Sequence, residues 1–274
     1  MKKTINNDNN KDLHLRILKN PSFTNNSNKK LKLSDVIILY NDSKDWKIIP
    51  LNIFMMYPLI YDTYYETQKN NKNIMSIISV YVCPYTLFSA VYFNEFVLNN
   101  QIYNNNLTLI DANDNDILFI PIVNETHSIA AETLLPNKYV RRNEIKFMTL
   151  RNAISMYPDA MFIDLKQINM IEKLVPNDYI TNDNILFKAF PFPNKYKPKT
   201  LIYVIEYKSK KINKYKYSVI IPKTNTFDIV KNGFDIYFDN MIEQIKNKGG
   251  IIYTCYWFAW SGINEKDTYK IITL

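Results

Sequence analysis

The sequence has few of the residues that build metal sites, disulfide frameworks and phosphate-binding loops. Among 274 residues there are 4 glycines, 2 cysteines and 2 histidines. Two cysteines are too few for a disulfide framework, and a zinc site would need nearly all of His14, His127, Cys83 and Cys255. Glycine-rich phosphate loops and the H-E-x-x-H and G-x-S-x-G motifs are missing as well. We therefore expect no metal and no cofactor.

The first 30 residues are rich in asparagine and lysine and lack an apolar run of the kind found in secretory leaders. We expect an intracellular protein without a signal peptide, whose cysteines are thiols. Residues 1–30 also lack sustained hydrophobic periodicity, and they are interpreted as a disordered, mobile tail.

One long stretch, Ile74 to Phe93, contains no charged residue. Twenty apolar residues can cross a bilayer as a helix, but this stretch has Pro84 near its middle and is rich in β-branched and aromatic residues. Such residues favour strands. We expect two buried strands joined around Pro84, and no membrane span.

The remaining patterns indicate mostly strands. Hairpins are expected from residues 36–40 with 46–51 and from 201–207 with 214–220. A helix should start after Thr149, a good N-cap, and end before Pro158. A second helix is expected over residues 235–248. The predicted fold class is α+β, β-rich, with antiparallel sheets and a few helices.

The two cysteines have similar surroundings. Ile77–Cys83 and Ile251–Cys255 both run from an isoleucine pair to a cysteine, and aromatic and small residues follow each. This pattern suggests a weak internal duplication. We expect both cysteines on related, buried strands, in two related lobes of about residues 31–170 and 171–274.

Several segments, in order along the chain, resemble the family of domain of unknown function (DUF) 3179. The matching segments are Pro50–Ile53 with Asp62, Val80–Tyr85 with Ser89–Ala90, Ile102–Asp111, Thr149 with Pro158–Asp159, and Tyr256–Trp260. The resemblance covers most of residues 31–274, and it implies a fold rather than an activity. The chain departs from the family at polar positions, where it has Tyr57, Pro58, Thr86, Leu150, Ala153 and Tyr157.

Cys83 is the best single candidate for a catalytic residue, with Asp62 or Asp159 in support because the family pattern retains both. A thiolate nucleophile needs a nearby base or positive field, which His127 or a lysine would have to supply. The alternative is a buried thiol that packs as a small apolar group.

A second candidate site is the basic segment Lys188–Lys216, in which lysines and tyrosines interleave. The formal net charge of +8 permits attraction to nucleic acid, and such a segment could contact phosphates and stack on bases. Lysines in a hairpin turn are equally expected of an exposed loop. The candidate nucleic-acid-binding residues are Lys208, Lys210, Lys211, Lys214 and Lys216.

Three functions therefore remain open. The loss of family polar residues favours a noncatalytic structural or binding module. The alternatives are a thiol-dependent enzyme that uses Cys83, and a basic protein that binds nucleic acid through the hairpin.

Overall fold

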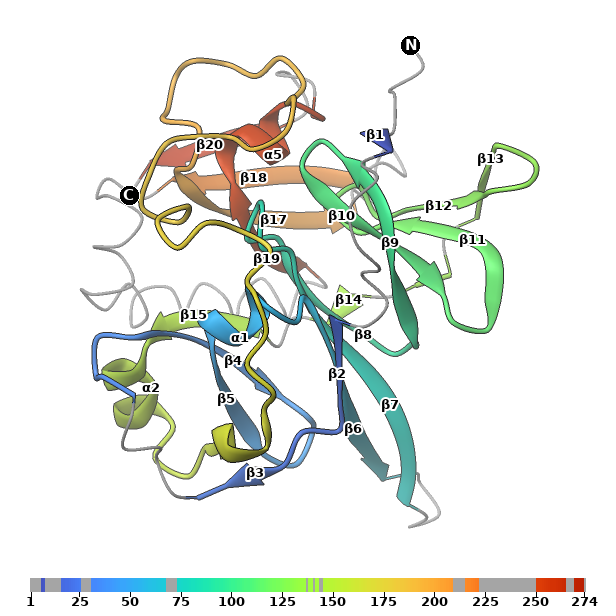
Figure 1. Ribbon diagram of the computed structural model, residues 1–274. Coiled ribbons are helices and arrows are strands. Elements are labelled where there is room, and N and C mark those ends of the chain that lie inside the picture. Colours follow the sequence, from blue (N-terminus) through green and yellow to red (C-terminus); the bar gives the residue numbers. More distant parts are fainter. Residues whose placement is uncertain are drawn as a thin grey trace.

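Four β-sheets and three short α-helices make up the described part of the chain (Figure 1). The structure is a computed structural model, and it describes residues 6–7, 16–25, 31–67, 73–136, 138–139, 141–142, 145–208, 215–221, 250–264 and 269–273. The predicted class, a β-rich α+β fold with antiparallel sheets and a few helices, is confirmed.

The sheets are named here A to D. Sheet A has the order β1 (Asn6–Asn7), β9 (Phe96–Tyr103), β10 (Asn106–Asp111), β11 (Asp114–Ile120), β12 (Glu125–Ser128) and β13 (Thr133–Leu135). Sheet B has the order β14 (Arg141–Arg142), β8 (Ser89–Tyr92), β7 (Asn73–Val82), β6 (Leu59–Thr67) and β2 (Ile17–Lys19). Sheet C has the order β15 (Ile145–Thr149), β4 (Val36–Asn41), β5 (Trp46–Pro50), β16 (Met161–Ile163) and β3 (Phe23–Thr24). Sheet D has the order β19 (Ile251–Tyr256), β17 (Leu201–Lys208), β18 (Tyr215–Ile221) and β20 (Tyr269–Thr273).

The helices are short and follow strands directly. They are α1 (Leu51–Phe54), α2 (Leu150–Met156), α5 (Trp257–Ser261) and the 3-10 turn η2 (Leu165–Gln167). Helix α2 confirms the predicted cap, because the Thr149 side chain accepts a hydrogen bond from the Asn152 N–H and the helix ends before Pro158. The helix expected over residues 235–248 lies outside the described residues.

Both predicted hairpins are present, as β4 with β5 and as β17 with β18. The uncharged central stretch forms β7 and β8, which pair antiparallel on either side of the turn that contains Pro84. No helix in the described ranges is both long and apolar enough to cross a membrane.

The expected tail at residues 1–30 is wrong for residues 16–25. Strand β2 pairs parallel with β6, and β3 pairs antiparallel with β16. Ile17, Leu18 and Phe23 pack against the main core, so this short apolar segment is sufficient to add an edge strand to each of two sheets. Apart from Asn6–Asn7 in β1, the rest of residues 1–30 lies outside the described residues.

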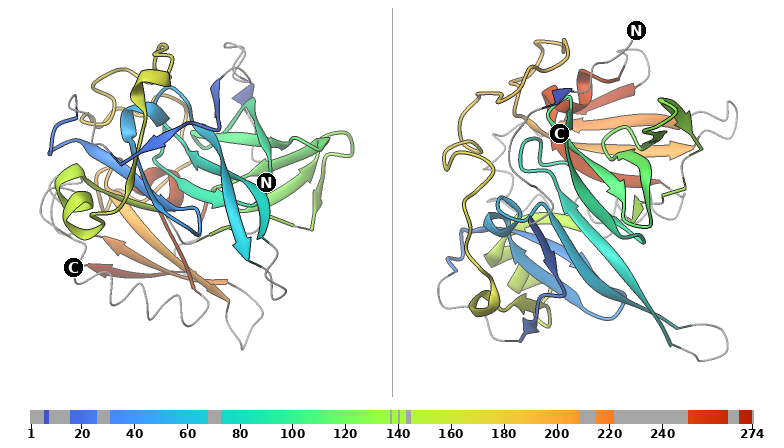
Figure 2. Two further views of the ribbon diagram at one scale, coloured as in Figure 1. Left: turned by 90° about the horizontal axis from the view of Figure 1, so that it is seen from below. Right: turned by 45° about the vertical axis from the view of Figure 1, so that its right-hand side comes forward.

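Sheets C and D repeat one topology. In sheet C, β4 and β5 form a hairpin, β15 pairs antiparallel with β4, α2 follows β15, and β16 returns parallel to β5. In sheet D, β17, β18, β19, α5 and β20 repeat the same order and the same directions. The two units lie at opposite ends of the molecule (Figures 1 and 2).

In each unit, equivalent backbone hydrogen bonds join the helix to the residues that come just before the first strand of that unit. The first two N–H groups of α2, those of Leu150 and Arg151, donate to the carbonyls of Asp35 and Leu33 over 2.9 and 3.0 Å. The first two of α5, those of Trp257 and Phe258, donate to the carbonyls of Thr200 and Pro198 over 2.8 and 3.0 Å. The matched pattern supports an internal duplication of this unit.

The two cysteines do not occupy equivalent positions of this repeated unit, so the expectation that they lie on related strands is wrong. Cys255 lies opposite Ile202 in sheet D, and its equivalent in sheet C is Met148, which lies opposite Ile37. Cys83 follows β7 of sheet B, outside both units. The larger of two hydrophobic clusters among the described residues includes side chains from both halves of the chain, and the division into lobes near residue 170 stays a prediction.

Candidate functional site

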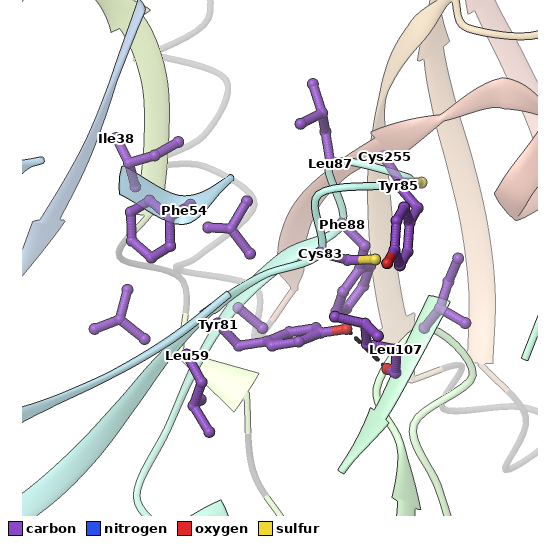
Figure 3. Close-up of a cluster of buried hydrophobic side chains, with 14 of the residues drawn as sticks. Ile38, Phe54, Leu59, Tyr81, Cys83, Tyr85, Leu87, Phe88, Leu107 and Cys255 are labelled. Atoms are coloured by element: carbon purple, nitrogen blue, oxygen red, sulfur yellow. Dashed lines mark hydrogen bonds between the residues drawn. The ribbon is translucent and has the colours of Figure 1, made fainter. Parts of the chain in front are cut away.

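Cys83 lies at the start of a tight turn directly after β7 (Figure 3). Its N–H donates to the Phe88 carbonyl and its carbonyl accepts from the Leu87 N–H, both over 2.9 Å. Leu87 has a φ of 52°, which closes the turn. The thiol is fully buried, and its sulfur lies 3.6 Å from the Asn105 carbonyl oxygen, to which it donates.

The surroundings of Cys83 do not activate a thiolate. Burial raises the pKa of the Cys83 thiol, and hydrogen bonds from Thr86 and Tyr81 only partly offset this effect. His127, one of the residues offered as a base, lies on β12 of sheet A, where its ring contacts Glu125 over 3.3 Å. A buried, protonated thiol is a poor nucleophile.

Three segments that carry the family resemblance meet around Cys83. We call the Cys83–Thr86 turn, the Asn104–Asn106 turn and helix α5 the motif cluster. The Thr86 hydroxyl donates to the Asn106 side-chain oxygen over 2.7 Å, and the Asn104 amide donates to the Ala259 carbonyl in α5 over 2.8 Å. The Tyr256 N–H, at the start of α5, donates to the Thr86 carbonyl over 2.8 Å.

The backbone conformation of the Asn104–Asn106 turn explains why asparagines occupy it. Asn104 and Asn105 both have positive φ, 44° and 65°, between the paired residues Tyr103 and Asn106. A two-residue hairpin with two positive φ values favours asparagine and glycine. All three asparagines are buried, so their side-chain amides bond within the protein.

Cys255 is also buried, on β19, and burial raises the pKa of its thiol. Burial of both cysteines is therefore confirmed. The described residues contain no group of three or more His, Cys, Asp or Glu side chains placed to hold a metal ion.

Asp62 belongs to a different cluster, between sheets B and C. Its carboxylate accepts from the Tyr40 hydroxyl over 2.7 Å and from the Lys47 ammonium over 2.6 Å. Lys47 also pairs with Asp42 over 2.7 Å, and its nitrogen lies 4.5 Å from the centre of the Phe23 ring. All three charged side chains are at most 9% exposed. The Asp62 carboxylate on sheet B is thereby joined to Tyr40 and Lys47 on sheet C, which ties the two sheets together.

Asp159 lies elsewhere again. It is exposed in the loop between α2 and β16, after Pro158. Within the described ranges, no hydrogen bond or ion pair joins Cys83, Asp62 and Asp159 to one another. The structure does not bring the three predicted catalytic residues together.

The basic hairpin is described only at its base. Lys208 and Lys216 lie on β17 and β18, opposite Tyr215 and Tyr207. The tip residues Lys210, Lys211 and Lys214 lie outside the described residues. Lys199 of the same basic segment is buried, and its ammonium donates to the Tyr179 carbonyl over 2.6 Å. This lysine does not present its charge to solvent.

A long irregular segment beside the motif cluster was not predicted from the sequence. Residues 168–200 contain no helix or strand and run along the outside of the molecule from sheet C to sheet D (Figure 2). The aromatic and proline residues of its second half, Phe187 to Tyr196, were the available signal.

The chain has no significant match among family models, curated proteins or solved structures. The resemblance to domain of unknown function 3179 therefore stays a prediction.

Proposed function

We propose that the chain is a noncatalytic binding or structural module. The observation that carries this proposal is the state of Cys83, the best candidate nucleophile. Its side chain is fully buried, burial raises the pKa of its thiol, and its hydrogen bond goes to a backbone carbonyl. Each of these features favours the unreactive thiol over the thiolate.

The carboxylates offered as supporting groups fit the same proposal. Asp62 is already bonded to Tyr40 and Lys47, and Asp159 is exposed in another part of the molecule. A general base must reach the proton that it removes, directly or through one water. Neither carboxylate has such a relation to Cys83.

The motif residues hold segments of chain together. Asn104 joins β9–β10 to α5, Asn106 joins the same hairpin to the Cys83–Thr86 turn, and Asn105 reaches the irregular segment at Phe187. Buried amide networks of this kind position chain segments with high specificity. This arrangement supports a binding or architectural role.

The proposal is tested by the rate at which Cys83 reacts with a thiol reagent in the folded protein. Slow reaction supports the noncatalytic module, and fast reaction of a thiolate supports the thiol-dependent enzyme. Nucleic-acid binding through the basic hairpin stays a prediction, and its signature is affinity that falls steeply with salt.

A further inference from the structure

Residues 183–198, which we call the strap, lie against the motif cluster and contain neither helix nor strand, with bends at residues 186–187 and a turn at residues 194–196. The strap is part of the irregular segment 168–200. Loops of this length without regular structure are uncommon in compact domains, and many of them are lids or binding segments.

Asparagine side chains bind the strap through its backbone. The Asn105 amide contacts both polar groups of Phe187: its oxygen accepts from the Phe187 N–H over 3.0 Å, and its nitrogen donates to the Phe187 carbonyl over 3.2 Å. The Asn104 oxygen accepts from the Phe190 N–H over 2.8 Å. A bidentate contact between a side-chain amide and the backbone reads no side chain of the bound segment.

Aromatic side chains of the strap pack on aromatic residues of the surface below. Phe187 contacts Tyr85 edge-on at 5.0 Å between ring centres, and Phe190 contacts Tyr103 at 5.4 Å. Farther along, Tyr196 contacts Trp257 at 5.2 Å, and the Trp257 indole N–H donates to the carbonyl of Pro193 over 2.9 Å. The strap rings are only partly buried, whereas the three aromatic side chains below them, Tyr85, Tyr103 and Trp257, are buried.

The strap sequence Phe190-Pro191-Phe192-Pro193 suits this mode of contact. Proline-containing extended segments dock in grooves lined by aromatic residues, because their backbone is already ordered before binding. The combination of amide contacts to the backbone and edge-on ring contacts is that of a peptide held in a groove.

We propose that the surface under the strap is a peptide-binding groove which the chain's own strap occupies as an autoinhibitory segment. The groove is formed by Tyr85, Asn104, Asn105, Tyr103 and Trp257. Its external ligand is an extended segment of a partner protein that contains aromatic residues and proline, as the strap does. This inference rests on the proposed binding function and names its partner class.

The test is binding of a fluorescent synthetic peptide with the sequence of residues 184–196 to the full chain, followed by anisotropy. The strap of the same chain competes with the peptide for this surface, so the wild type should bind the peptide weakly. The variant Phe187→Ala with Phe190→Ala weakens the strap and should bind at least ~10-fold tighter, because apparent affinity scales with the open fraction.

Two further variants sharpen this measurement. Asn105→Gly, added to the weakened strap, removes the amide contact and tolerates the φ of 65°, so peptide affinity should fall at least ~10-fold. The matched control is Met170→Ala, which truncates a side chain that is 68% exposed on the same irregular segment but outside the strap. The control should bind as weakly as the wild type, and a scrambled peptide should bind no variant.

Hydrogen exchange of the unaltered protein provides a readout that needs no variant to fold. The amides of the strap should exchange faster than those of β10 and β19, and excess peptide should accelerate strap exchange as it displaces the strap. The inference would be overturned if the strap amides exchanged at the same rate as those of β10 and β19 and if excess peptide did not change that rate. A wild-type dimer that the peptide dissociates would assign the groove to the strap of a second copy instead.

The outcome is separable from that of the proposed function. If the peptide does not bind, the peptide-binding groove is excluded, and the reactivity of Cys83 still tests the noncatalytic proposal. If Cys83 is labelled rapidly, the noncatalytic proposal is excluded, and the peptide affinity still tests the groove.

Discussion

Arg141 and Glu206 form a buried ion pair that joins β14 of sheet B to β17 of sheet D. The guanidinium and carboxylate lie 2.8 Å apart, with side chains that are 2% and 5% exposed. The guanidinium carbon also lies 4.5 Å from the centre of the Tyr253 ring. Removal of one partner leaves the other charge buried without compensation.

We therefore expect Glu206→Ala to lower the free energy of unfolding by ~3–5 kcal/mol, as measured by urea denaturation. The paired change Arg141→Met with Glu206→Leu removes both charges and should restore most of that loss. A Glu206→Ala variant within ~0.5 kcal/mol of the wild type, the range of ordinary surface substitutions, would show that the pair is not desolvated.

The hydrogen bond from Tyr40 to Asp62 gives a second stability prediction. Tyr40→Phe removes only the hydroxyl that donates to a buried carboxylate, so the free energy of unfolding should fall by ~1.5–3 kcal/mol. Tyr196→Phe is the matched control, because its partly buried ring keeps its contact with Trp257. Equal losses in the two variants would contradict the special role of the Tyr40 hydroxyl.

Asp111 predicts a loss of stability in acid. Burial alone would raise the pKa of its carboxyl, but hydrogen bonds from Lys138, Tyr139 and the Asn113 N–H outweigh it and lower the pKa to about 2. A carboxyl with a depressed pKa stabilises the fold above its ordinary pKa of 3.8, and this stabilisation disappears as the pH falls towards 2.

The wild type should therefore lose more stability between pH 4 and pH 2 than Asp111→Asn does, in urea denaturation at each pH. Lys138→Met, which removes one donor, should lie between the two. Parallel curves for the wild type and Asp111→Asn would contradict the lowered pKa.

The lowered pKa of Lys199 predicts a gain of stability in alkali. Burial lowers the pKa of its ammonium to about 8 from the ordinary 10.5, despite the nearby carboxylates of Asp183 and Asp178. The unfolded chain then holds more protons than the folded chain between these values, so unfolding becomes less favourable as the pH rises through this window.

The difference in unfolding free energy between the wild type and Lys199→Met should therefore shift in favour of the wild type from pH 7.5 to pH 9.5. The comparison removes the contribution of the tyrosines, which both proteins share. A pH-independent difference would mean that Lys199 titrates normally in the fold.

Elements with local signals could be predicted from the sequence. Thr149 before an apolar run specified the N-cap of α2, and apolar runs on either side of the polar turn at 41–45 specified the hairpin of β4 and β5. Burial of Cys83 and Cys255 followed from their uncharged surroundings.

The repeated unit and the position of the strap could not be predicted from the sequence. The repeat rests on hydrogen bonds from Leu150 to Asp35 and from Trp257 to Thr200, and backbone contacts leave no shared residue type at these positions. The strap depends on distant partners: Asn105 and Phe187 are 82 positions apart, and only the fold brings them together.

The most direct test of the noncatalytic proposal is the labelling rate of Cys83 by a chromogenic disulfide reagent. Cys255→Ala leaves Cys83 as the only thiol, and Cys83→Ala reports Cys255 in the same way. If Cys83 reacts only from unfolded molecules, a fraction of ~10⁻³ or less in stable proteins, labelling should be at least ~1,000-fold slower than in denaturant. Rapid, stoichiometric labelling of Cys83 in the folded protein, with a pH midpoint well below that of free cysteine, would contradict the account and indicate a thiol-dependent enzyme.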